Sequence, residues 1–311
     1  MLKNTSNIFE LFDDPSSARM SAWDLNKEYK NSFKRIVKAN NFEIINEGYK
    51  AVAKVDKEFG KSTISQEIIV YSDIERIDFK TKVDWHEDMK MLKVAYYPNI
   101  TTSKATYEIQ FGAIERPTHH NNEYDEVRFE ACGHRWADMS QNDCGLAIMN
   151  DCKYGYDAYD GTFRLTLLRS PLEPDYKADR GINEFTYSIY PHISTWQNSE
   201  VVNRAYELNE KVYLANNKMM KDVIKSASFV QVDNKDIILE TVKKAEDDDA
   251  YIFRFYEANG GGGMTNVKLA FDIKEVIQTN LMEKEERKLK VKDNSFKFEA
   301  NPYKIYSFKI K

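Results

Sequence analysis

The segment that decides the fold reads Arg76-Ile77-Asp78-Phe79-Lys80-Thr81-Lys82-Val83-Asp84-Trp85. From the second position onward, apolar or small side chains alternate strictly with charged ones. A period of two places every second residue on the same side of an extended chain, so the segment predicts a β-strand with one buried and one solvated face. We expect the buried face to consist of Ile77, Phe79, Thr81, Val83 and Trp85.

A comparable strand precedes this segment at Ser62 to Tyr71, and a turn at Ser72-Asp73 joins the two. Strands this close together, with no helix between them, predict antiparallel sheets packed face to face. The aromatic content of 13% points the same way, because Tyr and Phe suit half-buried pleated surfaces. Further strands are expected at Leu92 to Tyr97, Ala105 to Phe111, Val127 to Cys132, Cys144 to Asn150, Phe163 to Leu168 and Glu184 to Tyr190.

A second series of short strands begins after about residue 222 and predicts a small sandwich of its own. We expect two domains, residues 1–220 and 221–311, with the junction within 216–225. Helical patterns are few. Trp23 to Ala39 has mixed helical potential but a poor apolar stripe, and Val201 to Leu214 is expected to form a crossover or short helix. The second series comprises Ser228 to Gln231, Ile237 to Lys243, Ala250 to Ala258, Val267 to Phe271, Glu286 to Val291, Ser295 to Ala300 and Lys304 to Ile310.

Composition narrows the classes of partner. The net charge is -5 and no dense Lys/Arg cluster occurs, so we expect no nucleic-acid partner. No apolar run reaches the roughly eighteen residues of a membrane helix, and we expect no membrane partner. The N-terminus becomes acidic where a signal peptide would be apolar, and the three cysteines are odd in number and irregularly spaced. These features predict a cytoplasmic protein.

Polar and aromatic residues are densest between Glu115 and Arg180. Trp, Tyr, His, Asp and Arg in loops at strand ends suit sugar recognition, because aromatic faces stack on sugar rings and charged groups pair with hydroxyls. The alternative is structural: loops on a large sandwich need such side chains to satisfy their own backbone groups.

Two metal-like patterns occur, His86-Glu87-Asp88 and His119-His120. Residues i and i+2 of a strand share a face, but no third ligand follows from the spacing, so we predict no metal site. No local signature of a nucleophilic Ser or Cys is present either. The run Gly260 to Gly263 lacks the Lys-Ser/Thr of a phosphate loop and is interpreted as a flexible hairpin connection between Tyr256 and Val267.

Many short motifs in a fixed order resemble the C-terminal β region of the α-mannosidases of glycoside hydrolase family 38, in the cytosolic and bacterial branch. The similarity extends from Asn7-Ile8-Phe9-Glu10 to Asn301-Pro302-Tyr303. The motifs are residues 78–87, 92–95, 105–112, 115–119, 131–138 (Ala-Cys-Gly-His-Arg-Trp-Ala-Asp), 150–157 (Asn-Asp-Cys-Lys-Tyr-Gly-Tyr-Asp), 167–171 (Leu-Leu-Arg-Ser-Pro), 178–181 (Ala-Asp-Arg-Gly), 184–187 and 190–192.

The resemblance implies an all-β fold: a large antiparallel supersandwich like that of galactose mutarotase, followed by a small immunoglobulin-like β-sandwich. In that family an N-terminal α/β domain supplies an aspartate nucleophile and a zinc site, and a helical bundle follows it. Neither the nucleophile nor the zinc motif has a counterpart here. The resemblance therefore implies no catalytic residue and no metal or cofactor in this chain, partners in the catalytic α/β domain and the bundle, and an inactive isolated chain.

The resemblance also implies substrate contacts. Loops of the β region, including an arginine, close over one side of the family's pocket, and motif order makes Arg169 the candidate, with Asp179 and Arg180 beside it. Tyr154, Asp157 and His119 complete the predicted substrate-binding set for a mannose-containing oligosaccharide. The chain would then brace the catalytic domain, line one side of its pocket and contribute to an oligomer interface.

Two other functions stay open on the sequence. One is an independent carbohydrate-binding module, which would bind mannosides by itself. The other is a mutarotase-type sugar epimerase, which needs a histidine acid and a carboxylate base in one cleft, with His119, His134 and His192 as the available histidines.

Overall fold

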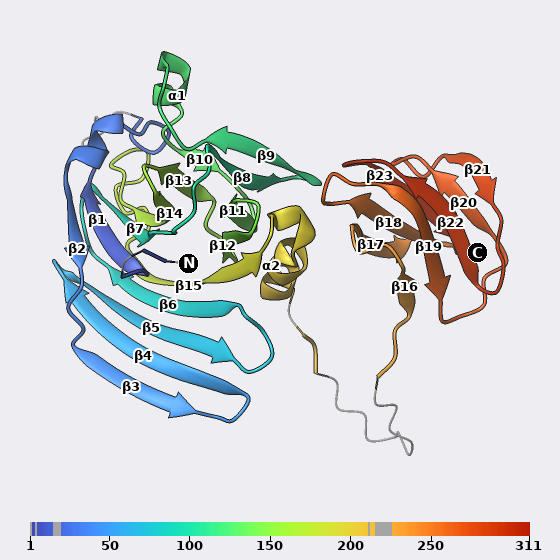
Figure 1. Cartoon of the computed structure of the whole chain (residues 1–311), viewed down its shortest axis with the longest axis horizontal. Coiled ribbons are helices and arrows are strands. Elements are labelled where there is room, and N and C mark those ends of the chain that lie inside the picture. The colour runs from blue at the N-terminus through green and yellow to red at the C-terminus, as the bar shows by residue number, and fades with distance from the viewer. Residues whose placement is uncertain (1, 4, 15–19, 211, 215–225) are drawn as a thin grey trace. The chain divides into compact units, whose positions relative to one another are not determined.

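The structure, a computed structural model, describes residues 2–3, 5–14, 20–210, 212–214 and 226–311. The chain divides into two compact units, of which unit 1 comprises Met1–Ile109 and Ile114–Lys211, and unit 2 comprises Gln110–Ala113 and Val212–Lys311 (Figure 1). The junction predicted within 216–225 lies outside the described residues.

Unit 1 contains two antiparallel sheets. The smaller has the strand order β10-β13-β14-β7-β1-β2, and the larger has the order β3-β4-β5-β6-β15-β12-β11-β8-β9. The smaller sheet consists of β1 (Ile8–Asp13), β2 (Phe33–Ile36), β7 (Lys90–Tyr96), β10 (Ala131–Cys132), β13 (Gly155–Tyr159) and β14 (Thr162–Arg169). The larger sheet consists of β3 (Asn41–Asn46), β4 (Lys50–Phe59), β5 (Ser62–Tyr71), β6 (Ile77–Trp85), β8 (Lys104–Ile109), β9 (Gly112–Pro117), β11 (Trp136–Ser140), β12 (Cys144–Asn150) and β15 (Gly181–Ile193).

The alternating segment forms β6, near the middle of the larger sheet, where it pairs with β5 and β15. Phe79, Thr81, Val83 and Trp85 are buried, whereas Lys80 and Lys82 on the opposite face are exposed. The predicted strand is thus confirmed, together with four of the five residues of its predicted buried face. The physical reason is the period of two, which matches the pleat of a strand that has a core on one side only. Ile77 is partly buried, and Asp78 on the opposite face is buried in a pair with Arg76.

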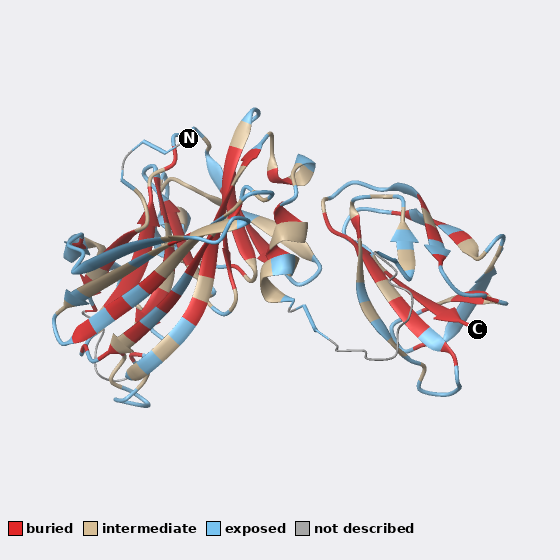
Figure 2. Ribbon diagram, turned by 90° about the horizontal axis from the view of Figure 1, so that it is seen from below, coloured by how far each residue is buried: buried red, intermediate tan, exposed pale blue. Residues whose placement is uncertain are grey.

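The two sheets pack face to face. A single core cluster includes Phe9, Leu92 and Leu165 from the smaller sheet and Phe79 and Ile148 from the larger. Figure 2 shows the buried residues concentrated along these strands, with exposed residues at the strand ends and loops. The all-β prediction, with large sheets in a sandwich, is confirmed.

The described residues of unit 1 include four short helices: η1 (Lys27–Asn31) between β1 and β2, α1 (Glu123–Val127) between β9 and β10, and η2 (Trp196–Asn198) and α2 (Val201–Asn209) after β15. The helix expected at Val201 to Leu214 corresponds to α2. The strand expected at Val127 to Cys132 was wrong over most of its length, because Val127 ends α1, whose N-cap Asn122 accepts a hydrogen bond from the Asp125 backbone. No helix in the described part of the chain is long and apolar enough to cross a membrane.

Unit 2 is a smaller sandwich of a three-stranded sheet, β16-β19-β22, and a five-stranded sheet, β17-β18-β23-β20-β21. Its core is rich in phenylalanine, including Phe253, Phe255, Phe296, Phe298 and Phe308. The second sandwich is confirmed, although β20 was not anticipated. The strands are β16 (Val230–Val232), β17 (Ile237–Lys244), β18 (Tyr251–Glu257), β19 (Gly263–Leu269), β20 (Val276–Thr279), β21 (Glu285–Leu289), β22 (Ser295–Ala300) and β23 (Ile305–Ile310).

The glycine run does not form the predicted hairpin. It connects β18 of one sheet to β19 of the other, and these strands do not pair. The fully buried Glu257 carboxylate accepts backbone N–H groups of Asn259, Gly260 and Gly261, each at 2.9 Å, and that of Tyr303 at 2.8 Å. The run thus wraps around an acidic side chain of its own unit, for which small residues leave room.

Candidate functional site

Three of the six predicted substrate-binding residues lie together around the connection between β14 and β15. Arg169 ends β14, and its backbone N–H donates to Asp179 Oδ2 at 3.0 Å. Its guanidinium donates from Nε to Asp14 Oδ2 and from Nη2 to the Asp24 carbonyl, each at 2.7 Å. The Arg169 side chain is 17% exposed, so it is held in one orientation by its own chain while its edge reaches solvent.

Arg180 belongs to the same cluster and is more accessible. Its guanidinium forms an ion pair with Asp88, which lies in the connection between β6 and β7, and its Nε donates to the Tyr176 carbonyl at 3.1 Å. The Arg180 side chain is 33% exposed. We call Arg169, Asp179 and Arg180 the arginine loop; it presents two guanidinium groups beside the end of β6.

The His86-Glu87-Asp88 triplet does not converge on one point. His86 Nε2 lies 2.7 Å from Asp84 Oδ1, whereas Asp88 pairs with Arg180. The carboxylate of Glu87 accepts hydrogen bonds from the Ser62 hydroxyl and the Lys61 backbone. Over the described residues, no group of three or more His, Cys, Asp or Glu side chains is placed to hold a metal ion. The residues present here do not fit the zinc site that the family resemblance implies for the complete enzyme.

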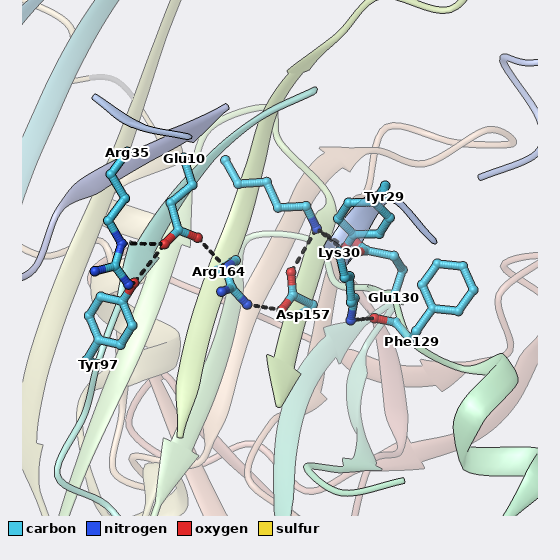
Figure 3. A network of polar contacts seen from close by, with 10 residues as sticks. Glu10, Tyr29, Lys30, Arg35, Tyr97, Phe129, Glu130, Asp157 and Arg164 are labelled. Carbon is cyan, nitrogen blue, oxygen red and sulfur yellow. Dashed lines mark hydrogen bonds and ion pairs between the residues drawn. The ribbon is translucent and has the colours of Figure 1, made fainter. Parts of the chain in front are cut away.

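Asp157 lies elsewhere, in a row of buried charges on the side of the smaller sheet that faces away from the core (Figure 3). Glu10 on β1 accepts Arg164 Nε at 2.7 Å and Arg35 Nε at 3.3 Å. Arg164 on β14 donates in turn to Asp157 Oδ1 at 3.0 Å. Cross-strand register places these residues side by side, since Glu10 faces Arg35 and Asp157 faces Arg164.

Lys93 of β7 completes the row. Its ammonium group donates to Asp157 Oδ2 at 2.8 Å, to Glu130 Oε1 at 2.5 Å and to the Tyr29 hydroxyl at 3.0 Å. The Tyr29 hydroxyl also bonds Glu130. A buried lysine is tolerated because all three of its donors have acceptors.

Burial and neighbouring charges shift the pKa values of the ionisable groups in this row. Burial alone would raise the pKa of Asp157, but the positive charges of Lys93 and Arg164 lower it below its usual value. Burial raises the pKa of Glu130 despite the attraction of Lys93. Burial, with the negative charges of Asp157 and Glu130, raises the pKa of Tyr29. Both carboxylates are bound to Lys93, so neither is placed to exchange a proton with a substrate.

Lys30 covers the row from the solvent side and is enclosed by aromatic rings. Its Nζ lies 5.7 Å from the ring centre of Tyr29, 5.6 Å from that of Phe129 and 5.8 Å from that of Tyr159, and it donates to the Phe129 carbonyl at 3.0 Å. Burial lowers the pKa of Lys30. The aromatic box that a sugar or cation could use is thus filled by a side chain of the protein itself.

His119 and Tyr154 have no hydrogen bond or ion pair with the arginine loop or the charge row among the described residues. His119 is in the connection between β9 and α1, with Nδ1 3.6 Å from Asp125 Oδ2. Tyr154 is half exposed in the connection between β12 and β13, and its ring centre lies 5.5 Å from that of His134. The structure therefore brings together Arg169, Asp179 and Arg180, and leaves Asp157, His119 and Tyr154 in other surroundings.

Sequence reasoning missed two groups of residues. Glu10, Lys93 and Arg164 are far apart in sequence, and only Asp157 of that row was singled out. Asp138 was missed as well: its Oδ2 lies 2.7 Å from His192 Nε2, and both side chains are buried. His192 was considered as an acid of an epimerase, but its side chain is only 1% exposed and its Nε2 is held by Asp138. The signal for the pair was the place of Asp138 and His192 in two of the family motifs, residues 131–138 and 190–192.

Comparisons with known proteins follow the same division of the chain. A family model described as "Glycosyl hydrolases family 38 C-terminal domain" matches residues 1–177, and one described as "Glycosyl hydrolases family 38 C-terminal beta sandwich domain" matches residues 236–308. The chain is 40% identical over 260 residues to Alpha-mannosidase G of Dictyostelium discoideum, which covers 81% of this chain and 24% of that protein. It is 38% identical over 251 residues to Alpha-mannosidase 2C1 of Homo sapiens, with 79% and 24% covered.

A solved structure shares the fold. The crystal structure of an alpha-mannosidase from Enterococcus faecalis V583 superimposes with a TM-score of 0.79 at 14% identity, over 98% of this chain and 38% of that chain. The chain thus spans about a quarter of the length of the curated relatives named above.

Proposed function

Because the chain belongs to glycosyl hydrolase family 38, whose C-terminal domains it represents, we propose that it is the non-catalytic part of an α-mannosidase, an enzyme that releases α-linked mannose. The observation that supports this most directly is the similarity of about four fifths of the chain to two proteins named alpha-mannosidases, at 40% and 38% identity. Its work would be to brace a catalytic domain and to line one side of the pocket.

The arginine loop is the part of the chain that we propose faces the substrate. Arg169 is oriented by Asp14 and by the Asp24 carbonyl, and Arg180 is partly exposed beside it. Guanidinium groups held in this way donate several hydrogen bonds in a fixed geometry, which suits the hydroxyl groups of a mannose-containing oligosaccharide. Asp179 supports the loop by binding the Arg169 backbone rather than by reaching outward.

Metal and nucleophile would belong to further polypeptide of the enzyme. Zinc supplies Lewis-acid chemistry in such an enzyme, and we propose that a catalytic α/β domain, followed by a helical bundle, holds it. The three free cysteines of this chain support a cytoplasmic location, where thiols remain reduced.

A docking face is available on unit 1. Phe42 and Ile44 of the edge strand β3 are 65% and 67% exposed. Register places Ile44 beside Ala53 of β4, and Ala53 beside Ile68 of β5, which packs against the core. The core-facing side of the larger sheet therefore continues as an exposed apolar surface, and we propose that the catalytic part of the enzyme covers it.

A chimera tests the proposal. The region of Alpha-mannosidase G that matches this chain would be replaced by this chain, and hydrolysis of 4-nitrophenyl α-mannoside would be measured for the chimera and for the isolated chain with and without zinc. We expect turnover by the chimera and none by the isolated chain. A folded chimera without activity, or an isolated chain that turns over the mannoside, would contradict the proposal.

A further inference from the structure

A groove of about 500 Å³ lies on unit 1, on the side of the larger sheet that faces away from the core. It is bounded by β8, β11, the turn after β11 and η2. Its lining includes Thr106, Ser140, Gln141, Thr195 and Trp196. This groove is far from the arginine loop: Gly181 and His192 are eleven positions apart on β15, or about 36 Å of extended chain.

The groove offers hydroxyl and amide groups with little free charge. Thr106 and Ser140 contribute hydroxyl groups, and Gln141 holds the opposite wall by accepting the Thr101 backbone N–H at 2.8 Å. The charged residues of the lining, Lys104 and Glu115, form an ion pair with each other. The lining therefore favours a neutral ligand with several hydrogen-bonding groups.

The buried pair Asp138–His192 lies next to this groove: neither side chain is part of the lining, but Asp138 neighbours two lining residues. Asp138 is directly across from Thr106 and two residues before Ser140 on β11, so all three side chains share one face. His192 reaches Asp138 from β15 by passing over Gly145 of β12, where a Cβ would overlap the imidazole. Glycine at this position is thus what permits the contact between strands that are not neighbours.

Polar atoms of this pair and of Trp136 are left without hydrogen bonds among the described residues. Asp138 Oδ1, His192 Nδ1 and Trp136 Nε1 are buried and have no hydrogen-bond partner within the described portion of the chain. Trp136 shares the face of Asp138, two residues away, and its ring packs 4.9 Å from that of Trp196 in the groove wall. Burying unpaired polar atoms is costly, so each of these atoms calls for a hydrogen-bond partner.

We propose that the groove binds a neutral polyhydroxylated ligand, a sugar or sugar alcohol, one hydroxyl group of which reaches the Asp138–His192 pair. A hydroxyl group is a complementary partner because its O–H donates to the unpaired carboxylate oxygen, Asp138 Oδ1. Binding requires a side chain of the groove wall to shift, because this oxygen is sealed from solvent. Trp196 is placed to report this shift.

The test is a fluorescence titration of the purified chain with methyl α-D-mannopyranoside in one arm and mannitol in the other. We expect saturable binding in the millimolar range with a change in tryptophan emission. Binding of the mannopyranoside but not of mannitol would identify a sugar ring, rather than a linear sugar alcohol, as the ligand class. Thr106→Val and Ser140→Ala each remove one hydroxyl group, and we expect about threefold to tenfold weaker binding for each.

Ser65→Ala is the matched control, since Ser65 is an exposed serine of β5 that bonds Asp56 outside the groove. The proposal is overturned if neither probe binds saturably, or if folded Thr106→Val and Ser140→Ala bind as tightly as Ser65→Ala. Thermal unfolding of every variant verifies the fold. The measurement needs no catalytic domain, so its failure would leave the proposed mannosidase role untouched.

Discussion

Lys93 Nζ and Asp157 Oδ2 are 2.8 Å apart, although the residues are separated by 64 positions and their strands, β7 and β13, are not neighbours. Both side chains are buried, and β14 lies between the two strands. This pair joins the first half of the chain to the β13–β14 hairpin, and β14 ends in Arg169. The charge row therefore stabilises the framework from which the arginine loop extends.

Removal of the Lys93 charge should be strongly destabilising. Lys93→Met leaves the buried Asp157 carboxylate and the partly buried Glu130 carboxylate without their common partner, and we expect a loss of about 3–5 kcal/mol in the free energy of unfolding. Urea denaturation measures this loss. Lys82→Met is the control, because the Lys82–Glu184 pair is exposed and should contribute less than about 1 kcal/mol. Equal losses for the two variants would show that the row is not a structural element.

Acid should weaken the fold through Asp157. Its pKa is lowered in the folded state from an ordinary value of 3.8, so its contribution is complete above that value and is lost as the pH falls further. We expect the stability difference between the native chain and Asp157→Asn to shrink as the pH is lowered from neutrality to below 3.8. Thermal unfolding across this range measures it, and a difference independent of pH would argue against the ion pairs as its source.

Gly145 and His192 should be energetically coupled. Gly145→Ala places a methyl group where the imidazole lies, and we expect a loss of about 1–3 kcal/mol in stability from overpacking. In His192→Ala the space is free, so the same glycine substitution should cost much less there. A double-mutant cycle on the free energy of unfolding measures this coupling. Additive losses would mean that the ring can move aside.

Arg169 should matter for turnover in the complete enzyme. In the chimera described above, Arg169→Ala should lower kcat/KM for an aryl α-mannoside by about 100-fold, because a fixed guanidinium would no longer orient the sugar. Asp14→Asn weakens the support of Arg169 but keeps the arginine, so a smaller loss is expected. If both variants lost the same stability and the same activity, Arg169 would have a structural role only.

The apolar surface of β3 should make the isolated chain self-associate. Phe42→Ser with Ile44→Ser removes two exposed apolar side chains from an edge strand, and we expect less association in sedimentation velocity experiments at high protein concentration. Val242→Ser, a comparable exposed position on β17, is the control and should leave association unchanged. Association that persists in the double variant would mean that a different surface of the chain is responsible.

Local pattern was sufficient for strands with one buried face, such as β5 and β6, because alternation is a property of adjacent residues. It was insufficient at Val127 to Cys132, where Val127 still belongs to the asparagine-capped helix α1 and only Ala131–Cys132 pairs as β10. It also failed at the glycine run, since the sheet that a strand joins is decided by distant partners.

The same distinction applies to the site. Motif order was enough to bring Arg169, Asp179 and Arg180 into one prediction, because they are at most eleven residues apart and share one connection between strands. Asp157 was grouped with them only on its side-chain chemistry. The structure places Asp157 instead between Lys93 and Arg164. Lys93 comes from β7, and Arg164 lies directly opposite Asp157 in the β13–β14 hairpin.

The sequence by itself determined the all-β architecture, the two sandwiches and the family, since these follow from local periodicity and from the order of short motifs along the chain. Only the tertiary structure decided which charges neutralise one another, which glycine lets His192 reach Asp138, and which apolar face stays uncovered. The reason is that burial and cross-strand contact depend on residues tens of positions apart, and a charged or polar side chain has the same local pattern whether it faces water, a partner or a ligand.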